Sequence, residues 1–398
     1  MWDSVVLGLG GVGSFALRAL SRESKNVLGI ERFARGHAKG SSHGQSRIYR
    51  KAYFENPEYV PWIEYSLKEF RQLEKETDKA IMKECGMLLV QEEDNGKYLE
   101  VCRTSAREHN VVTETMRVGE LRERFPQFRY TEDMVGILEP GGGLLRPERT
   151  MRAALEQAED HGATVWENSI VKSLKEIQDG SDCIIELIVQ RPGGEEEQVL
   201  ARSALVAAGA WASELIPSYA PHLKVIRQIQ TWIDVSSLDD SEIYDAGNMP
   251  AFVLVTPEWP LPLYGIPVDG ECDGPMYKNC IKFGVHGVED VVNPNQNPSI
   301  ISPSEIEEMM KAMKTGMDPK VCALSFTDKS PCMYTMTKDG DFMIGAPKGY
   351  KKVCVVAGLS GHGFKMVPAL GQMLADFALE KSLDPWKADF CSPSRFGV

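Results

Sequence analysis

The sequence predicts an α/β fold, α+β overall, in which a discontinuous Rossmann-like domain carries an inserted substrate domain built on a mixed sheet. The chain has 398 residues, more than the ~100–200 of a typical single domain. A glycine-rich turn lies between an apolar strand and a helix at residues 8–13, and a second such turn lies at residues 358–363. Because both ends carry elements of one domain type, that domain is expected to be assembled from separated segments.

The first elements form a β-α-β unit. Ser4–Leu7 is predicted as a short buried strand, and a helix is expected directly after the glycines at 8–13. Asn26–Ile30 is predicted as the second strand, which ends on Glu31. Residues 35–46 are rich in Gly, Ser and His and are predicted as a loop.

The three glycines of this turn have separate tasks in a dinucleotide site. Gly8 permits the tight turn, Gly10 lets a pyrophosphate approach the backbone, and Gly13 lets the helix pack closely on the sheet. The free N–H groups at the helix start stabilise the pyrophosphate. Glu31 is placed to accept hydrogen bonds from a ribose 2′-hydroxyl, which disfavours NADP. The motif alone leaves NAD and FAD open.

The rest of the chain continues the alternation of strands and helices. Pro61 is expected to open a helix with Ile63, Leu67 and Phe70 on one apolar face. Further helices are predicted over 149–161, 303–313 and 364–379, and strands over 86–90, 164–166, 205–208, 225–235 and 353–357. The predicted nucleotide domain comprises residues 1–82, 146–216 and 333–398, and the substrate domain residues 83–145 and 217–332.

Composition excludes several classes of protein. The formal net charge is -13 and no basic cluster is present, so no nucleic-acid partner is expected. No apolar run approaches the ~20 residues of a membrane span, and no signal peptide is seen. The nine cysteines include no C-x-x-C pair, which argues against a metal site and a disulfide framework and favours an intracellular protein.

Four segments carry a resemblance to a known family. They are Gly40–Tyr53, Lys282–His286, Cys332–Thr335 and Ser360–Lys365. In order and in spacing they resemble the monomeric sarcosine oxidase family, which includes pipecolate oxidase and N-methyltryptophan oxidase. The resemblance extends over nearly the whole chain and implies FAD as the cofactor.

The resemblance also implies roles for individual residues. Cys332 is expected to carry the flavin covalently, as an 8α-S-cysteinyl linkage, and a thiolate is a competent nucleophile for that attachment. Arg50 and Lys365 are expected to bind the substrate carboxylate. Arg47 is expected beside the flavin, and Lys282 is expected to activate O₂.

Other positions are expected to complete the site. His286, Tyr264 and Tyr334 resemble residues that line the substrate pocket, and His43 and Tyr53 are weaker cases of the same kind. The expected cofactor contacts are Gly8, Gly10, Gly13, Glu31, Ser42, His43, Arg47, Cys332, Gly361, His362, Gly363 and Lys365.

These residues together predict oxidation of a secondary amino acid to the imine, with O₂ reduced to H₂O₂ by a monomeric enzyme. Three alternatives stay open: a flavin-dependent amine dehydrogenase with another acceptor, an NAD-dependent dehydrogenase, and a non-catalytic flavin-binding protein. An insertion around 271–279 departs from the family and puts the wall of the substrate pocket in doubt. The chain ends on Phe396-Gly397-Val398 and not on a peroxisomal tripeptide, so a cytoplasmic or peroxisomal location is left open.

Overall fold

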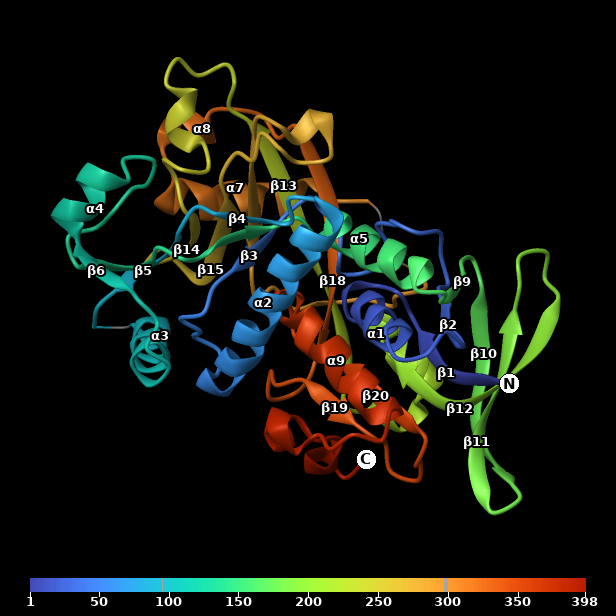
Figure 1. Ribbon diagram of the computed structural model, residues 1–398. Coiled ribbons are helices and arrows are strands. Elements are labelled where there is room, and N and C mark those ends of the chain that lie inside the picture. Colours follow the sequence, from blue (N-terminus) through green and yellow to red (C-terminus); the bar gives the residue numbers. More distant parts are fainter. Residues whose placement is uncertain (95, 297–299) are drawn as a thin grey trace.

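Two large sheets and one small sheet organise the computed structural model, which describes residues 1–94, 96–296 and 300–398 (Figure 1). The first sheet has eight strands and the second has nine. A three-stranded antiparallel sheet joins β3 (Arg47–Tyr49), β8 (Gly143–Leu145) and β4 (Met82–Glu84). None of the helices in the described part of the chain combines the length and apolar character needed to cross a membrane.

The first sheet has a parallel centre with an antiparallel extension. Its strands are β1 (Trp2–Leu7), β2 (Val27–Ile30), β9 (Thr164–Trp166), β10 (Ile170–Asp179), β11 (Asp182–Gln190), β12 (Glu196–Val206), β19 (Met343–Gly345) and β20 (Val353–Ala357). Strand β12 pairs in parallel with β1 and β20 through its second half, and antiparallel with β11 through its first half. The β10–β11 hairpin projects from the body of the molecule (Figure 1).

Helices cover one face of the first sheet. They are α1 (Gly11–Ser21), α2 (Val60–Thr77), α5 (Pro147–Asp160) and α9 (Val367–Ala378), which lie together in Figure 1. Their apolar faces meet in one core that includes Leu17, Phe70, Ala154 and Leu370. Gly371 lets α9 approach α1 closely, since a β-carbon there would lie 2.7 Å from backbone atoms of α1. The glycine turn after β1 is therefore held against a rigid layer.

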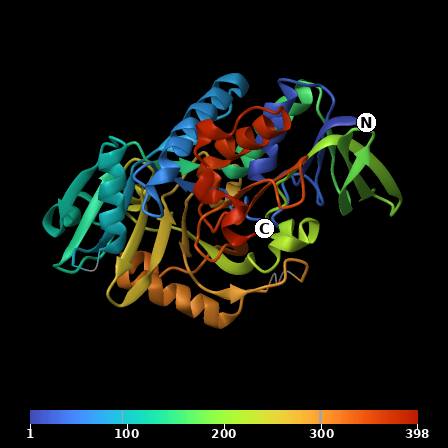
Figure 2. The same ribbon diagram turned by 90° about the horizontal axis from the view of Figure 1, so that it is seen from below.

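The second sheet is antiparallel apart from one parallel pair, β14 with β5. Its strands are β5 (Met87–Glu92), β6 (Glu114–Arg117), β7 (Met134–Glu139), β13 (Lys224–Asp234), β14 (Ala251–Thr256), β15 (Trp259–Ile266), β16 (Cys280–Val285), β17 (Asp290–Val291) and β18 (Asp328–Met336). Helix α7 (Pro303–Gly316) covers it in Figure 2, and the remaining helices are α3 (Lys97–Glu108), α4 (Val118–Arg124), α6 (Ala212–Leu215) and α8 (Pro319–Cys322).

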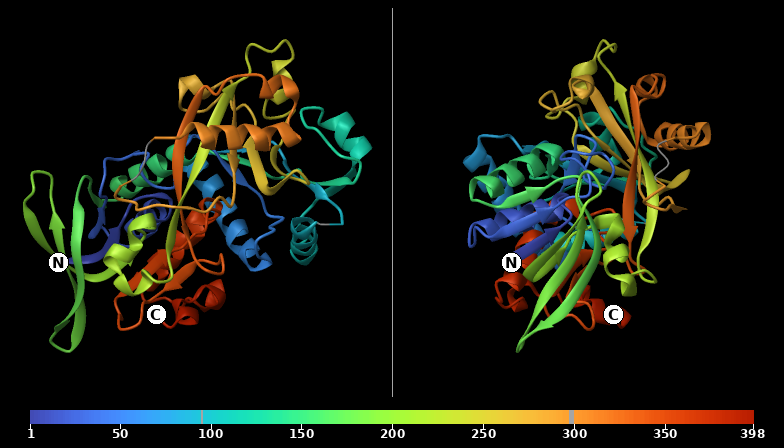
Figure 3. Two further views of the ribbon diagram at one scale, coloured as in Figure 1. Left: turned by 180° about the vertical axis from the view of Figure 1, so that it is seen from behind. Right: turned by 90° about the vertical axis from the view of Figure 1, so that its right-hand side faces the viewer.

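The longest ladder of the second sheet joins β13 and β18, which run side by side in Figure 3. All nine residues of β18 pair with β13, from Asp328 opposite Trp232 to Met336 opposite Lys224. The predicted boundary between residues 332 and 333 falls inside this strand. The division into two domains stays a prediction, and β18 is the strand that carries the chain from the second sheet towards β19 and β20 of the first.

Most predicted elements are found within a few residues of their expected bounds. Thr164–Trp166 and Val353–Ala357 match, and the loop at 35–46 is irregular. The strand predicted at 205–208 instead begins at Glu196, because its polar first half pairs with β11. The β10–β11 hairpin and helices α3 and α4 were not predicted.

The insertion at 271–279 is anchored by buried charge. Arg146, at the start of α5, is 2% exposed and donates from Nε and Nη2 to the Asp269 carboxylate at 2.7 Å each. Its Nη2 also donates to Glu271 at 2.9 Å. Residues 271–279, all of which the structure describes, do not line the cavity described below. The insertion therefore does not form part of the wall of that cavity.

Arg146→Met should destabilise the protein by about 3–5 kcal/mol, because it leaves the buried Asp269 carboxylate without its two hydrogen bonds from Arg146 and, among the described residues, with only a longer ion pair to Lys83, at 3.8 Å. Arg149→Met is the matched control, since Arg149 follows on the same helix and pairs with the more exposed Asp273. That variant should lose about 1 kcal/mol or less. Urea unfolding of the holoprotein measures both, and equal losses would contradict the role of Arg146.

Candidate active site

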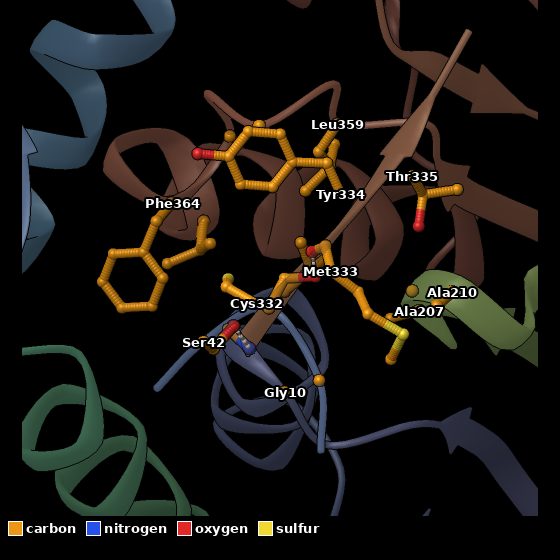
Figure 4. Close-up of a pocket in the computed structure, with 18 of the residues that line it drawn as sticks. Gly10, Ser42, Ala207, Ala210, Cys332, Met333, Tyr334, Thr335, Leu359 and Phe364 are labelled. Carbon is orange, nitrogen blue, oxygen red and sulfur yellow. Dashed lines mark hydrogen bonds between the residues drawn. The ribbon is translucent and has the colours of Figure 1, made fainter. Parts of the chain in front are cut away.

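One large cavity lies where the glycine turn after β1, the loop before β3, strand β18 and the turn after β20 come together. Residues from both large sheets line it, including Gly8, Gly10, Glu31, Ser42, Arg47, Arg50, Tyr264, Lys282, His286, Cys332, Tyr334, Gly361, His362, Gly363 and Lys365. In the close-up, Gly10 and Ser42 lie below Cys332, Tyr334 lies above it, and Phe364 lies to its left (Figure 4). The four segments quoted from the sequence thus meet in one place.

The glycine turn is shaped to receive a ligand. Gly8 has φ +90°, and a β-carbon on Gly13 would lie 1.8 Å from the Gly8 carbonyl oxygen. A β-carbon on Gly10, by contrast, would meet nothing closer than Ser42 Oγ at 3.9 Å. Gly10 caps α1 with no side-chain hydrogen bond, and the N–H of Gly11 makes only a long hydrogen bond, at 3.3 Å, to Ser42 Oγ, so the helix start can donate to a phosphate. These features fit the pyrophosphate of a dinucleotide.

Glu31 lies at the end of β2, where a ribose is expected. Its carboxylate accepts from the N–H of Leu9 at 2.7 Å and from the N–H of Phe33 at 3.0 Å, and His37 Nε2 lies 3.3 Å away. Burial alone would raise the pKa of Glu31, but the contacts with His37 and the backbone prevail and lower it. A carboxylate has about four lone-pair positions, so acceptor capacity remains for ribose hydroxyls.

Strand β18 presents Cys332 to the cavity. Because side chains alternate along a strand, Cys332 and Tyr334 point to one side and Met333 and Thr335 to the other (Figure 4). The thiol is 3% exposed and lies 3.8 Å from Arg47 Nη2. Burial raises the pKa of Cys332, while the positive charges of Arg47 and Lys282 oppose that rise.

Lys282 projects from β16 onto a turn of the loop before β3. Its Nζ donates to the carbonyls of Gly44 and Ser46, each at 2.8 Å, and the residue is 2% exposed. Burial, reinforced by the charge of Arg47, holds the pKa of Lys282 well below its ordinary value, whereas Cys332 and Glu148 oppose that lowering. Arg47 lies nearby and donates to the carbonyls of Ser46 and Ser41, each at 2.8 Å.

Arg50 also lines the cavity and is 4% exposed. Its Nη2 donates to both oxygens of Glu55, at 2.8 and 2.7 Å, and the guanidinium lies 3.7 Å from the ring centroid of Phe54. Burial would raise the pKa of Glu55, but Arg50 lowers it to about 2. The second terminal nitrogen of Arg50, Nη1, is buried and has no hydrogen-bond acceptor among the described residues.

Lys365 follows the turn after β20 and lies near Arg50, since Lys365 Nζ and the Arg50 guanidinium lie 4.9 and 4.5 Å from the ring centroid of Tyr53. Its Nζ donates to the carbonyl of His362 at 2.8 Å and lies 3.5 Å from the hydroxyl of Tyr53. That hydroxyl lies 2.5 Å from His362 Nδ1, and His362 Nε2 lies 3.1 Å from the carbonyl of Gly340. The Gly340 contact assigns the imidazole proton to Nε2, so Nδ1 accepts from Tyr53. Burial and the charge of Arg50 lower the pKa of Lys365 to about 7.

Aromatic and imidazole side chains form the wall between these charged groups. The rings of His286 and Tyr334 lie 5.6 Å apart, and burial lowers the pKa of His286 and raises that of Tyr264 to about 12. All three side chains are therefore neutral near pH 7. Gly361 leaves room for Tyr334, since a β-carbon there would lie 2.4 Å from that ring.

The cavity brings together nearly every residue that the sequence singled out. His43 is an exception because it is buried outside the lining, with burial lowering its pKa to about 3. Gly13 and Tyr53 also lie behind the surface and support residues that line it. Sequence reasoning missed Glu55, Gln230 and Glu148, whose roles depend on contacts with distant segments. Among the described residues, no group of three or more His, Cys, Asp or Glu side chains is placed to hold a metal ion.

Comparison with known proteins agrees with this geometry. A family described as FAD dependent oxidoreductase matches residues 3–377. A monomeric sarcosine oxidase from Streptomyces avermitilis is 31% identical over 379 residues, which cover 95% of this chain and 94% of that protein. An N-methyl-L-tryptophan oxidase from Yersinia pestis is 28% identical over 385 residues, covering 96% and 95%.

Solved structures share the fold. NikD, an amino acid oxidase essential for nikkomycin biosynthesis, superposes with a TM-score of 0.78 at 20% identity, over 96% of this chain and 94% of its own. An L-proline dehydrogenase from P. horikoshii superposes with a TM-score of 0.77 at 19% identity, over 99% and 97%. At these identities the likeness concerns the fold.

Proposed function

The chain belongs to the FAD dependent oxidoreductase family, which agrees with the resemblance of its four segments to the monomeric sarcosine oxidase family. We propose that it oxidises a secondary amino acid of the sarcosine or L-pipecolate type to the imine. FAD dependence sets aside the NAD-dependent dehydrogenase alternative. The observation that carries the proposal is the pair of buried cations, Arg50 and Lys365, which line the same cavity as the glycine turn. Bound FAD supplies the two-electron acceptor of the reaction.

The substrate carboxylate is assigned to Arg50 and Lys365. Nη1 of Arg50 has no acceptor in the described structure, so a carboxylate can take it while Nη2 stays on Glu55. Lys365 adds a second donor from the opposite segment. Charge-assisted bonds to two cations give the acid both affinity and orientation. Glu55 prevents the unliganded site from holding two uncompensated positive charges.

The pocket selects the neutral form of the substrate amine. Arg50 and Lys365 disfavour a nearby ammonium, and the aromatic wall offers neutral side chains at His286, Tyr264 and Tyr334. The neutral amine has a lone pair, which forms the C=N bond as a hydride equivalent leaves the adjacent carbon. Two electrons and two protons then reduce O₂ to H₂O₂. The imine is released, and a linear imine is hydrolysed by water.

A dehydrogenase with another electron acceptor is the alternative that one observation favours, because the fold is shared with an L-proline dehydrogenase as well as with oxidases. The buried Nζ of Lys282 supports the oxidase, since it lies in the cavity and, among the described residues, no carboxylate is in direct contact with it. Counting H₂O₂ released per amine oxidised separates the two: one per turnover supports the oxidase, and none refutes it.

The first prediction concerns binding of a carboxylate that cannot be oxidised, such as propionate. Lys365 has a pKa of about 7 in the free protein, and a bound carboxylate stabilises its charged form. Affinity should therefore be full below about pH 7 and fall about tenfold per pH unit above it, until the raised pKa of the complex is reached. Titration of the flavin absorbance with propionate from about pH 6 to pH 9 measures this dependence.

Lys365→Met should weaken the binding of propionate by roughly tenfold to a hundredfold at low pH and remove its dependence on pH. Lys348→Met, at an exposed position, is the control and should retain both the affinity for propionate and its dependence on pH. A pH dependence that survives in Lys365→Met would exclude Lys365 from the carboxylate site.

The second prediction concerns covalent flavin at Cys332, which lies in the cavity beside Arg47. Acid precipitation of the wild type should leave the yellow colour in the pellet, and precipitation of Cys332→Ala should release it to the supernatant. Cys354→Ala is the control, because that cysteine is buried in β20 outside the cavity lining. Complete release of flavin from the wild type would end the proposal.

The third prediction assigns Lys282 to the reaction with O₂. Electron transfer to O₂ creates negative charge in a poorly hydrated cavity, and one preorganised donor is worth ~3–4 kcal/mol there. Lys282→Met should slow reoxidation by a factor on the order of 10² to 10³ and change reduction by substrate much less. Stopped-flow measurement of both half-reactions decides it, and unchanged reoxidation would remove Lys282 from this role.

A further inference from the structure

The turn at Gly44–Ser46 lies between two opposite charges. On one side, the Glu148 carboxylate accepts from the N–H of Gly44 at 2.6 Å. It also accepts from the N–H of Gln45, which lies 3.1 and 3.2 Å from its two oxygens. On the other side, the carbonyls of Gly44 and Ser46 accept from Lys282 Nζ, each at 2.8 Å. Glu148 is fixed in the first turn of α5, one residue after the helix-opening proline.

The backbone of this turn needs an external restraint. Gly44 has φ +99° and Gln45 has φ +67°, both in the left-handed region that a glutamine rarely adopts. A β-carbon on Gly44 would also lie 2.3 Å from Gln230 Oε1, so a larger residue there would displace the Gln230 amide. This conformation directs the N–H groups of Gly44 and Gln45 to one side of the turn. Glu148 stabilises it by accepting hydrogen bonds from both of them.

We propose that Glu148 is a positioning residue for Lys282, which acts through the peptide groups of the Gly44–Ser46 turn to keep the ammonium fixed and charged beside the flavin. The inference rests on the proposed role of Lys282 in the reaction with O₂. One peptide group, between Gly44 and Gln45, carries both contacts, because its N–H donates to Glu148 and its carbonyl accepts from Lys282 Nζ. Linked hydrogen bonds of this kind polarise one another in a poorly hydrated interior.

The charges around Lys282 make such a partner necessary. Arg47 on β3 opposes a second positive charge, and Trp232 on β13 offers only the face of its ring, 5.5 Å from Nζ. His43 is neutral, with its pKa lowered to about 3. Cys332 on β18 and Glu148 on α5 act in the stabilising direction. If Cys332 is consumed in a thioether, Glu148 is the acid that still compensates the ammonium.

Glu148→Gln in the holoenzyme tests the proposal in two ways. Reoxidation should slow by about tenfold, and the pH above which it declines should move down, because loss of the negative charge lowers the pKa of Lys282. Reduction by substrate should change much less. Independently of activity, the amides of Gly44 and Gln45 should exchange with deuterium faster, as measured by mass spectrometry of the peptide that contains them.

Two further variants separate charge from structure. Glu148→Asp keeps the charge but has a shorter side chain. It should restore the pH profile of reoxidation to a greater extent than it restores the slow exchange of the Gly44 and Gln45 amides. Glu156→Gln removes an acid from the same helix that pairs with Lys79, and it should behave like the wild type. Equal slowing of both half-reactions in Glu148→Gln, or an unchanged pH profile of reoxidation, would overturn the proposal.

A double variant distinguishes this inference from the role of Lys282 itself. If Glu148 acts through Lys282, adding Glu148→Gln to Lys282→Met should slow reoxidation no further. A further tenfold loss in that background would refute the inference while leaving Lys282 in place. Normal reoxidation in Lys282→Met alone would instead refute the oxygen role, whatever Glu148 does to the turn.

Discussion

The cavity depends on the burial of positive charge in an acidic protein. Arg50, Lys282 and Lys365 are at most 6% exposed, although the chain carries a formal net charge of -13. An unpartnered ammonium or guanidinium in a protein interior is strongly disfavoured, so each cation needs compensation that still leaves it able to act. The three solutions differ. Arg50 has a carboxylate at Glu55, Lys282 has two carbonyls, and Lys365 has a carbonyl and a phenol.

The two large sheets meet this requirement because they bring segments that are distant in the sequence together around the cavity. Strand β18 pairs with β13 along its whole length, so Cys332 and Tyr334 are set at fixed heights on the cavity wall. Strand β16 pairs with the other edge of β13 and places Lys282 opposite Trp232. The glycine turn and the loop before β3 approach from the first sheet. The site therefore lies between the two large sheets, where turns and loops of the first meet strands of the second.

Much of this arrangement could be predicted from the sequence, because it depends on short local sequence patterns. Gly8, Gly10 and Gly13 between a strand and a helix predict the nucleotide end, and Glu31 follows at the expected place. The β10–β11 hairpin had a signal as well, since glycines at 180 and 193 mark turns with positive φ. Cys332, Lys282 and Lys365 were found through the resemblance, since nothing local separates them from ordinary buried or surface residues.

Glu55 and Glu148 could not be predicted in the same way. Each is one acid among 57 Asp and Glu residues, and what distinguishes it is a contact across the fold, with Arg50 in one case and with the N–H groups of residues 44 and 45 in the other. Arg146-Pro147-Glu148 predicts the start of a helix and no more. Acids that tune a buried cation are visible only once the backbone has been placed.

The different compensation of the two buried lysines is consistent with the different anions that we propose for them. A substrate carboxylate carries its charge before it arrives, so Lys365 can have a pKa of about 7 and still be charged by the act of binding. The negative charge on O₂ exists only during electron transfer, and a lysine that must wait for that charge has to be ionised beforehand. In the proposed roles, two carbonyls and, through them, Glu148 favour the charged form of Lys282, while burial and Arg47 lower its pKa. The proposed oxygen side of the cavity therefore needs a permanent partner for its lysine, and the proposed substrate side does not.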